Sequence, residues 1–485
     1  MNQRLSTLTR PTRRFLSVVS LVAAGTVMPM GLDAGAAPAK GTSGGTVLQT
    51  NLVSDLAGVA AVQDPNLVNS WGISESSGSP FWISDNNAAV ATLYQVPGAS
   101  NTPVSIPSLV VQIPTPVDPQ GGGTPTGTVF NSASTSGAFK IGPTSLPAVF
   151  LFATEDGTIT GWNPAVDPTH AVIAVDKSGN NFTNPDPNKQ TGAVYKGLAI
   201  ATSGTPIVPG DANSTALLYA TNFRAGTIDV YDATLKPPTG LSTGAFTDPE
   251  MPHGYAPFNV QVLDGKVYVT YARQDATKHD DLAGPHRGFV DVFNLDGTPG
   301  LPGNMVRLVS RGQLDSPWGL AIAPSGFAGL STQSTNPTLL VGNFGNGRIH
   351  AFDATNGSPL GQLTDPDGES IQIDGLWALQ VGNGGAGGAG NTVYFTAGPF
   401  SESHGLFGSL ATAAPGSAEG PAEAQWVQAN VDVVQLDLQQ LVTDSSSGAP
   451  PATIRQDTRA LDAASHALHR AQRAFADDTR DDTAP

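Results

Sequence analysis

The sequence of 485 residues contains no cysteine, which excludes disulfide bonds, thiolate metal ligands, cysteine nucleophiles and iron–sulfur clusters. Charged residues make up only 13% of the chain, and the net charge of −17 argues against a nucleic acid bound through its phosphates. The apolar run at residues 18–30 is too short and too interrupted to span a bilayer. We therefore expect a mature chain without a transmembrane anchor, held together by its hydrophobic core alone.

Glycine and proline are abundant instead, at 56 and 39 residues. Both favour short strands joined by many turns over long helices. Hydrophobic residues make up 39% of the chain, and apolar clusters recur without a Gly-X-Y period. This composition favours a folded, strand-rich protein and disfavours a disordered or collagen-like one.

Residues 1–36 have the pattern of a signal peptide. A basic segment precedes the apolar run, and Ala34-Gly35-Ala36 has the small-residue pattern of a cleavage site. The twin-arginine spacing is imperfect, so we favour the general secretory route. The basic residues are Arg4, Arg10, Arg13 and Arg14. The sequence predicts a periplasmic or secreted protein.

A short motif repeats about every sixty residues, which is the period of a repeat architecture. Its anchor positions are Gly72, Gly197, Asn259, Gly319 and Gly375. In four copies an aromatic or lysine residue precedes a small or polar one, and in the last copy Asp374 precedes the anchor. A degenerate copy near Gly127 fills the long interval between the first two anchors, so six repeats result.

Each repeat continues with further strand patterns separated by tight turns. In the clearest copy, strands at 217–223 and 227–231 flank Ala225-Gly226. Six multi-stranded units of this kind predict an all-β fold, a six-bladed β-propeller. A β-helix fits less well because its coils are much shorter. Residues 47–55 precede the first blade, and we expect them to add the outer strand of the last blade and close the ring.

The repeats cover residues 47–410 and then stop. Residues 411–451 read as a linker, within which 427–442 form either one more strand or a docked segment. Apolar residues seven apart in 452–485 predict a short C-terminal helical extension before an acidic end. They are Ile454, Leu461, Leu468 and Phe475.

Oxygen-bearing side chains follow corresponding strands in several repeats, and propeller geometry places them on one face. If they converge near the central channel, they would suit a divalent cation such as calcium. Alternatively, each only caps its own turn. The metal-ligand candidates are Glu155, Asn222, Asn259, Asn343 and Asp374, with Asn86 nearby.

The fourth repeat carries a long insertion at residues 273–287 where its siblings have a short turn. Long loops on rigid scaffolds often carry function, so this one is a candidate for a His/Asp metal site or an acid–base pair. A solvated charged insertion is the alternative. The catalytic candidates on this face are His253, His279, His286, His404, Arg273 and Asp275.

Three tryptophans occupy a recurring place in the repeats: Trp71, Trp318 and Trp377. They would either line a wall for a sugar or apolar ligand or pack between blades, and their fixed position favours packing. The G-x-G-x-x-G match at 382–387 lies between two strands and opens no helix, so it predicts a hairpin loop and no dinucleotide site.

Several strings resemble a family of uncharacterised, exported bacterial β-propeller proteins, some of which carry a C-terminal PEP-CTERM sorting tail. The strings are 256–261, 269–272, 316–321, 340–345, 374–379, 394–399 and 404–408. The resemblance implies the fold and export but no reaction. This chain has no Val-Pro-Glu-Pro tail, which puts sorting by that route in doubt.

More distantly, the arrangement is similar to NHL-repeat proteins and to calcium-dependent lactonase and gluconolactonase propellers. In those lactonases, a cation held by acidic and amide residues polarises the ester carbonyl. The five metal-ligand candidates would be analogues by residue type.

Two functions are consistent with these sequence features. The first is a binding scaffold of the cell envelope that holds a small molecule, a saccharide or an envelope protein. The second is a metal-dependent hydrolase or lyase of lactone-like substrates. We favour the first because the sequence alone defines no catalytic constellation.

Overall fold

The computed structural model describes residues 43–98, 104–332 and 334–414, with isolated positions from 434 to 465. All of them belong to one compact unit, Gly41–Pro485. The expected signal peptide, residues 1–36, lies outside the described residues. None of the helices among the described residues is long and apolar enough to cross a membrane.

The first three blades are antiparallel sheets formed by consecutive strands. Blade 1 contains β3 (Ser70–Ser74), β4 (Phe81–Asp85), β5 (Val90–Tyr94) and β6 (Val111–Gln112). Blade 2 contains β7 (Pro125–Phe130), β10 (Phe150–Thr154), β11 (Thr158–Trp162) and β12 (Val172–Asp176). Blade 3 contains β13 (Tyr195–Thr202), β14 (Ala216–Asn222) and β15 (Thr227–Asp232).

The next three blades continue the pattern, and the last takes its outer strand from the beginning of the described chain. Blade 4 contains β16 (Tyr255–Leu263), β17 (Lys266–Arg273), β18 (Phe289–Phe293) and β19 (Arg307–Ser310). Blade 5 contains β20 (Pro317–Ile322), β21 (Thr338–Asn343), β22 (Ile349–Asp353) and β23 (Pro359–Thr364). Blade 6 contains β24 (Leu376–Val381), β25 (Val393–Ala397), β26 (Leu406–Thr412) and β1 (Ser43–Ser54).

Short elements complete the fold. A small hairpin joins two of them, and one short strand pairs with β1. They are β2 (Val62–Gln63), β8 (Lys140–Ile141), β9 (Leu146–Pro147), η1 (Ser134–Ser136), η2 (Pro187–Lys189), η3 (Pro302–Asn304), η4 (Phe327–Thr332) and α1 (Pro399–Glu402).

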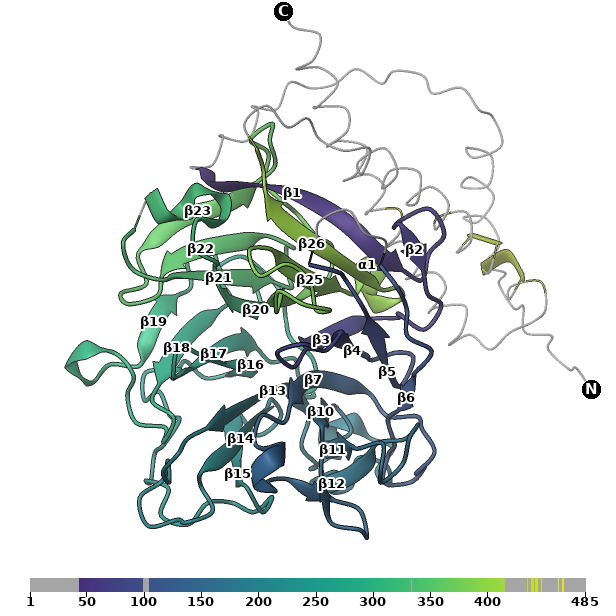
Figure 1. Ribbon diagram of the computed structural model, residues 1–485, viewed down its shortest axis with the longest axis vertical. Coiled ribbons are helices and arrows are strands. Elements are labelled where there is room, and N and C mark those ends of the chain that lie inside the picture. The colour runs from purple at the N-terminus through teal and green to yellow at the C-terminus, as the bar shows by residue number, and fades with distance from the viewer. Residues whose placement is uncertain are drawn as a thin grey trace, which may run out of the picture. The chain divides into compact units, whose positions relative to one another are not determined.

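The inner strands of the six blades form a closed ring (Figure 1). In order, β3, β7, β13, β16, β20 and β24 each contact the next, and β24 contacts β3 again. A cyclic set of antiparallel sheets arranged in this way is a β-propeller. The predicted six-bladed, all-β fold is therefore confirmed.

Every inner strand carries a β-bulge at the same place, where the pairing register shifts. Small residues follow it because neighbouring inner strands approach closely there. A Cβ on Gly72 would lie 2.3 Å from Thr126 O, and one on Gly127 would lie 2.4 Å from Leu198 N. These contacts explain the repeated motif, and the degenerate copy near Gly127 is indeed the start of a blade.

The anchor predicted for the sixth repeat was wrong by three residues. In blade 6 the bulge lies between Leu376 and Leu379, so Ala378 follows Trp377 as Gly319 follows Trp318. Gly375 instead precedes the strand with φ +64°, and a Cβ there would lie 2.2 Å from Gly398 O. Gly375 is therefore required by a turn and does not lie where the inner strands approach each other.

The ring is closed by β1. It pairs antiparallel with β26 from Val47↔Thr412 to Ser54↔Leu406, as expected for residues 47–55. Its first residues also pair parallel with β23 of blade 5, at Ser43↔Gln362 and Thr46↔Thr364. One strand therefore ties together two blades and removes an open sheet edge.

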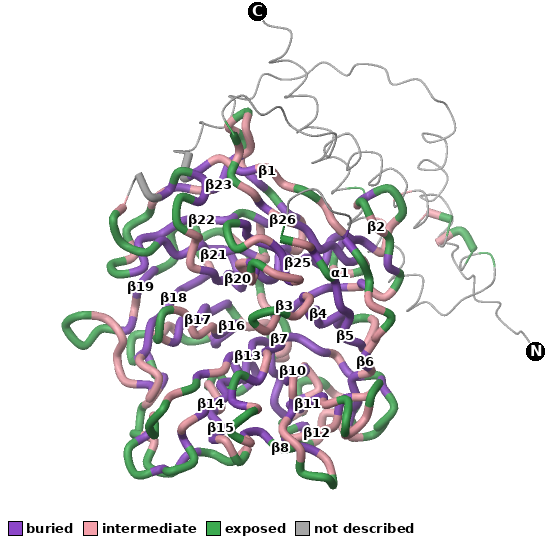
Figure 2. The backbone as a smooth tube through the Cα atoms, viewed as in Figure 1, coloured by how far each residue is buried: buried purple, intermediate pink, exposed green. Residues whose placement is uncertain are grey.

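The core lies in and between the blades, while loops are more exposed (Figure 2). At the centre, three buried indoles pack against one another. The rings of Trp71 and Trp377 stack at 3.6 Å between centroids, and Trp318 meets them edge-on at 6.3 and 5.9 Å. The packing interpretation of these residues therefore holds, and they form no open ligand wall.

The C-terminal predictions fall mostly outside the described residues. Within the expected segment 427–442 and just beyond it, described positions such as Leu441, Val442 and Thr443 are helical, so these positions do not belong to a strand. The hydroxyl of Thr443 donates to Gln439 O at 2.8 Å, a bond made one helical turn back. Leu461 and Ser465, in the expected C-terminal extension, are helical as predicted.

Candidate functional site

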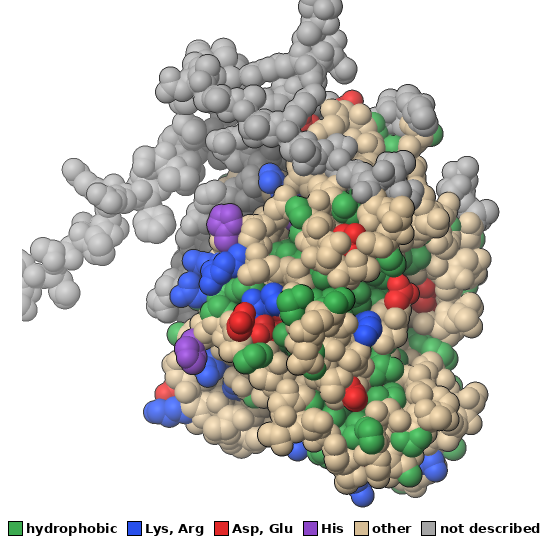
Figure 3. Space-filling model, turned by 90° about the vertical axis from the view of Figure 1, so that its left-hand side faces the viewer, with side chains coloured by type: hydrophobic (Ala, Val, Ile, Leu, Met, Phe, Trp, Pro, Cys, Tyr) green, Lys and Arg blue, Asp and Glu red, His purple; other side chains and the backbone are tan. Residues whose placement is uncertain are grey.

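Polar side chains of five blades gather where the inner strands begin. Figure 3 shows one side of the protein, on which charged side chains occur in small groups among hydrophobic and uncharged ones. We call the gathered residues the polar cluster: Asn69, Asn86, Glu155, Lys196, His279, Asp280 and Glu402.

Lys196 is the centre of the polar cluster. It sits in the bulge of β13, at the place that holds Trp71, Trp318 and Trp377 in other blades. Its side chain is only 2% exposed, yet its ammonium pairs with Glu155 and lies 3.3 Å from Asp280 Oδ1. Below it, the Trp71 ring centroid is 5.0 Å from Nζ, within the range of a cation–π contact.

The charge of Lys196 is preserved despite burial. Burial alone would lower the pKa of Lys196, but the carboxylates of Glu155 and Asp280 raise it above the ordinary value. The residue therefore remains an ammonium across the physiological range. It is a fixed positive charge placed between two acidic side chains.

Glu155 comes from the turn between β10 and β11. Its backbone N–H donates to Thr124 O at 3.1 Å, and Gly157 completes the turn with φ +88°. Asn86, from the corresponding turn of blade 1, donates through Nδ2 to Glu155 Oε2 at 3.0 Å. One carboxylate oxygen thus faces Lys196 and the other faces a neutral amide.

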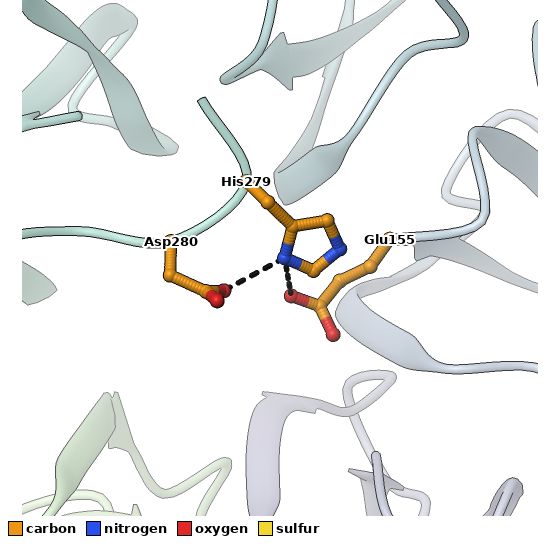
Figure 4. A group of neighbouring side chains, drawn as sticks. All are labelled: Glu155, His279 and Asp280. Carbon is orange, nitrogen blue, oxygen red and sulfur yellow. Dashed lines mark hydrogen bonds and ion pairs between the residues drawn. The ribbon is translucent and has the colours of Figure 1, made fainter. Parts of the chain in front are cut away.

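The long blade-4 loop supplies His279 and Asp280. Asp275 shapes this loop, because its carboxylate accepts hydrogen bonds from His279 N at 2.9 Å and from Thr277 Oγ1 at 2.7 Å. His279 Nδ1 lies 2.8 Å from Asp280 Oδ1 and 4.0 Å from Glu155 Oε1 (Figure 4).

The two titratable groups of that loop shift each other's pKa. Burial alone would lower the pKa of His279, but Asp280 and Glu155 raise it above its usual value. Burial alone would raise the pKa of Asp280, but His279 and Lys196 hold it well below the usual range. The Asp280 side chain is still 67% exposed, so this carboxylate is open to a ligand.

Glu402 reaches the polar cluster from α1 in blade 6. Its Oε2 accepts a hydrogen bond from Asn69 Nδ2 at 2.9 Å, and its carbonyl accepts one from Asn87 Nδ2 at 2.7 Å. Burial raises the pKa of Glu402 to about 7; Glu155 adds to the rise and Lys196 opposes it. This carboxyl can hold or release a proton near neutral pH.

Asn69 connects the polar cluster to the aromatic centre. Its Oδ1 accepts a hydrogen bond from Trp377 Nε1 at 3.1 Å, while its Nδ2 faces Glu402 and lies 3.5 Å from Asn86 Oδ1. A Cβ on Gly398 would lie 2.3 Å from Asn69 Oδ1, so a larger residue there would displace this side chain.

A metal ion is a second way to fill this site. Glu155, His279 and Asp280 each offer a ligand atom, and these atoms lie within 4.8 Å of one another. However, Lys196 already pairs with both carboxylates. A metal would have to displace a buried ammonium, which is unfavourable because the ammonium would lose its partners. With Lys196 in place, the three residues fit a resident metal poorly.

Of the five predicted metal ligands, only Glu155 joins the polar cluster. The others make hydrogen bonds elsewhere: Asn222 Oδ1 accepts from Ala225 N (3.2 Å), Asn343 Oδ1 from Asp315 N (3.2 Å) and Asp374 Oδ2 from Phe400 N (3.0 Å), and Asn259 Nδ2 donates to Trp318 O (2.7 Å). These bonds cap turns or join blades.

The six catalytic candidates separate into three groups. His279 lies in the polar cluster, and Asp275 lies outside it and accepts a hydrogen bond from the backbone N–H of His279. His404 Nδ1 lies 2.6 Å from Asp55 Oδ2, next to the Glu402 turn. His286 is exposed and bonds Gly312 O, and His253 and Arg273 are exposed beside β16 and β17.

Sequence reasoning assigned no role to Lys196, Glu402 or Asn69. For Lys196 a signal existed: it is the lysine at a place where three other repeats carry tryptophan. Glu402 and Asn69 had no comparable signal. Both have positive φ without being glycine, and glutamate in particular is not a residue type that marks such a turn.

A closed ring of six blades with a polar cluster where its inner strands begin defines this chain as a β-propeller protein. It is 31% identical to "Uncharacterized protein R648" of Acanthamoeba polyphaga mimivirus over 362 residues, which cover 74% of this chain and 78% of that protein. It is also 31% identical to "Uncharacterized protein L690" of the same virus over 335 residues, covering 68% and 77%.

The chain therefore belongs to the family of these mimivirus proteins. The relatives are viral and not bacterial, and their names assign no activity. No protein-family model matches the chain.

Among solved structures, the chain is similar to a putative 6-phosphogluconolactonase from Bacteroides uniformis (12% identity, 62% of this chain, 70% of that one, TM-score 0.32). It is also similar to a streptogramin B lyase (12%, 75%, 96%, 0.35) and to an α-L-arabinofuranosidase mutant from Fusarium graminearum (9%, 76%, 98%, 0.42). At these values the similarity says nothing about activity.

Proposed function

We propose that this protein is an exported β-propeller that binds a small polar ligand at the polar cluster. One observation carries the proposal: the buried ammonium of Lys196 pairs with Glu155 and Asp280 in a cluster of polar side chains contributed by five blades. Burying a lysine and its partners is costly, and a fold that needed only stability would gain as much from apolar packing. A binding role therefore explains the burial of these charged side chains better than a contribution to stability does.

The chemistry of the polar cluster favours a ligand rich in hydroxyl groups, such as a saccharide. Each carboxylate can accept several hydrogen bonds, and Asp280 offers its oxygens on the exposed side. Glu402, protonated in part near neutral pH, can act as either donor or acceptor. An envelope protein that places a polar group here is the corresponding macromolecular partner.

A thermal-shift screen of the mature protein against a panel of saccharides, sugar acids and lactones tests this proposal. At least one compound should raise the melting temperature of the wild type but not of Lys196→Met or Asp280→Asn. Lys189→Ala is the matched control, because that lysine makes an ion pair with Asp186 at η2, in the connection between blades 2 and 3. A compound that stabilises all of these variants equally would place binding elsewhere.

A metal-dependent hydrolase or lyase is the second candidate. It would use Glu155, His279 and Asp280, whose ligand atoms lie within 4.8 Å of one another, and it requires a metal to displace the ammonium of Lys196 from the two carboxylates. Elemental analysis of the purified protein after exhaustive dialysis separates the two proposals. About one equivalent of metal, lost in His279→Ala, would favour the hydrolase and justify a lactone screen. A metal content unchanged by that variant would count against it.

Export is part of the first proposal. The support is the basic, apolar and small-residue order of residues 1–36. Expression of the full chain in a bacterium, followed by mass spectrometry of the periplasmic and culture fractions, tests it. The expected product begins just after Ala36, and a full-length product retained in the cytoplasm would contradict export.

A further inference from the structure

The turn that presents Glu402 has an unfavourable backbone. Phe400, Ser401 and Glu402 have φ values of 57°, 55° and 68°, so three consecutive non-glycine residues adopt the left-handed region. The left-handed region is unfavourable for such residues because it brings Cβ close to the following carbonyl oxygen. A turn of this kind persists only where the surrounding structure fixes it.

Contacts from β1 fix one end of this turn. Asp55 directly follows β1, and its Oδ2 lies 2.6 Å from His404 Nδ1, while its Oδ1 accepts from Gly405 N at 2.9 Å. A single carboxylate therefore holds two successive residues of the turn. The His404 ring in turn packs edge-on against Phe400, with 5.6 Å between centroids.

The other end of the turn is held by blade 6 itself and by blade 1. Asp374 accepts from Phe400 N at 3.0 Å, and Asn87 donates to the Glu402 carbonyl at 2.7 Å. Backbone bonds continue to blade 1, because Asn69 N donates to His404 O at 3.1 Å. The turn is thus fixed from three sides, and β1 provides one of them.

We propose that the ring-closing strand completes the polar cluster, with Asp55 and His404 as the positioning residues of Glu402. Neither residue belongs to the cluster. They act by holding the left-handed turn, and through it the Glu402 carboxylate against Asn69. The inference rests on the proposed function only for the claim that the cluster binds a ligand.

The indole N–H signal of Trp377 provides a local readout. Trp377 Nε1 donates to Asn69 Oδ1, and Asn69 Nδ2 donates to Glu402, so displacement of Glu402 changes the surroundings of this indole. In a proton–nitrogen correlation spectrum of the mature protein, Trp377→Phe identifies the signal. His404→Ala should shift it, and His404→Asn, which retains a side-chain donor, should restore it towards its wild-type position.

His170→Ala is the matched control. His170 Nδ1 lies 3.2 Å from Asp167 Oδ1 in blade 2, so this variant removes a His–Asp pair unconnected with Glu402. Its Trp377 signal should not move. The proposal is overturned if His404→Ala leaves the signal in place, or if His404→Asn shifts it as much as alanine does.

Asp55→Asn covers the case in which His404→Ala does not fold. It keeps an acceptor for Gly405 N but weakens the bond to His404, so the Trp377 signal should shift, and an unshifted signal again overturns the proposal. This readout requires no ligand. Failure of the saccharide screen and failure of the positioning role are therefore recognised separately.

Discussion

Two loops occupy the same place in their blades, and each brings a carboxylate to the polar cluster in a different way. The blade-4 loop, residues 274–287, joins β17 to β18, and the blade-6 turn, residues 398–405, joins β25 to β26. Both deliver a carboxylate to the polar cluster. The longer loop delivers Asp280 with an exposed, strongly ionised side chain, and the shorter turn delivers Glu402, partly buried and raised in pKa.

The comparison shows that a loop can bring a carboxylate to the polar cluster either by having more residues or by adopting an unfavourable backbone conformation. The blade-4 loop has enough residues to bring His279 with Asp280, so the carboxylate arrives with its own partner. The blade-6 turn has few residues and uses three left-handed ones, so Glu402 depends on Asn69 and on distant clamps. The longer loop therefore presents an ionised carboxylate with its own partner, whereas the strained turn holds a carboxyl whose burial raises its pKa to about 7.

Removal of the cation that both loops face should have the largest effect. Lys196→Met removes the buried partner of Glu155 and one of the two partners of Asp280. We expect the free energy of unfolding to fall by about 3–5 kcal/mol. Urea denaturation at neutral pH measures it. Lys189→Ala, whose lysine side chain is 73% exposed, should cost less than about 1 kcal/mol. Equal losses in the two variants would show that Lys196 is not an essential partner of the carboxylates.

The strained turn should reveal itself through pH. The pKa of Glu402 is raised from 4.5 to about 7 in the folded state. Between these two pH values the folded state keeps a proton that the unfolded state releases, so the free energy of unfolding of the wild type falls as pH rises from 4.5 to about 7. Glu402→Gln should therefore gain on the wild type over that range, by about 1–3 kcal/mol at most. Melting curves from pH 4 to 8 test this, and a constant difference would contradict it.

The long loop should show the smallest effect and the opposite sign. The pKa of Asp280 is lowered from its usual value, so its stabilisation is present above pH 4 or so and disappears in acid. Asp280→Asn should be less stable than the wild type near neutrality, by less than about 1 kcal/mol because the side chain is largely exposed. The same melting series measures it. If Asp280→Asn instead became more stable relative to the wild type as pH rises, as expected for Glu402→Gln, the distinction between the two loops would be removed.

The sequence predicted the features that repeat. The Gly72 and Gly319 anchors, the tight turn at Gly226 and the closing strand at 47–55 each follow from a pattern shared by several blades. The long blade-4 loop could also be recognised as a candidate, because it interrupts that pattern. His279 of that loop does lie in the polar cluster.

What did not repeat could not be predicted. Lys196 finds Glu155 in another blade, and such a pairing depends on the ring being closed. The amides of Asn222 and Asn343 look like ligands by type, but they are used in nearby turns. Residue type restricts the possible chemistry, while the contacts between blades decide which residues share it.

The pairing of β1 also sets an order of events during synthesis. Val47 must wait for Thr412, more than 300 residues later in the chain, before its ladder with β26 can form. Contacts so distant in sequence form slowly, and until then β1 is an unpaired strand with its backbone groups available to other chains. The last step of folding is therefore also the step at which the protein is most open to mispairing, and at which a chaperone would be of most use.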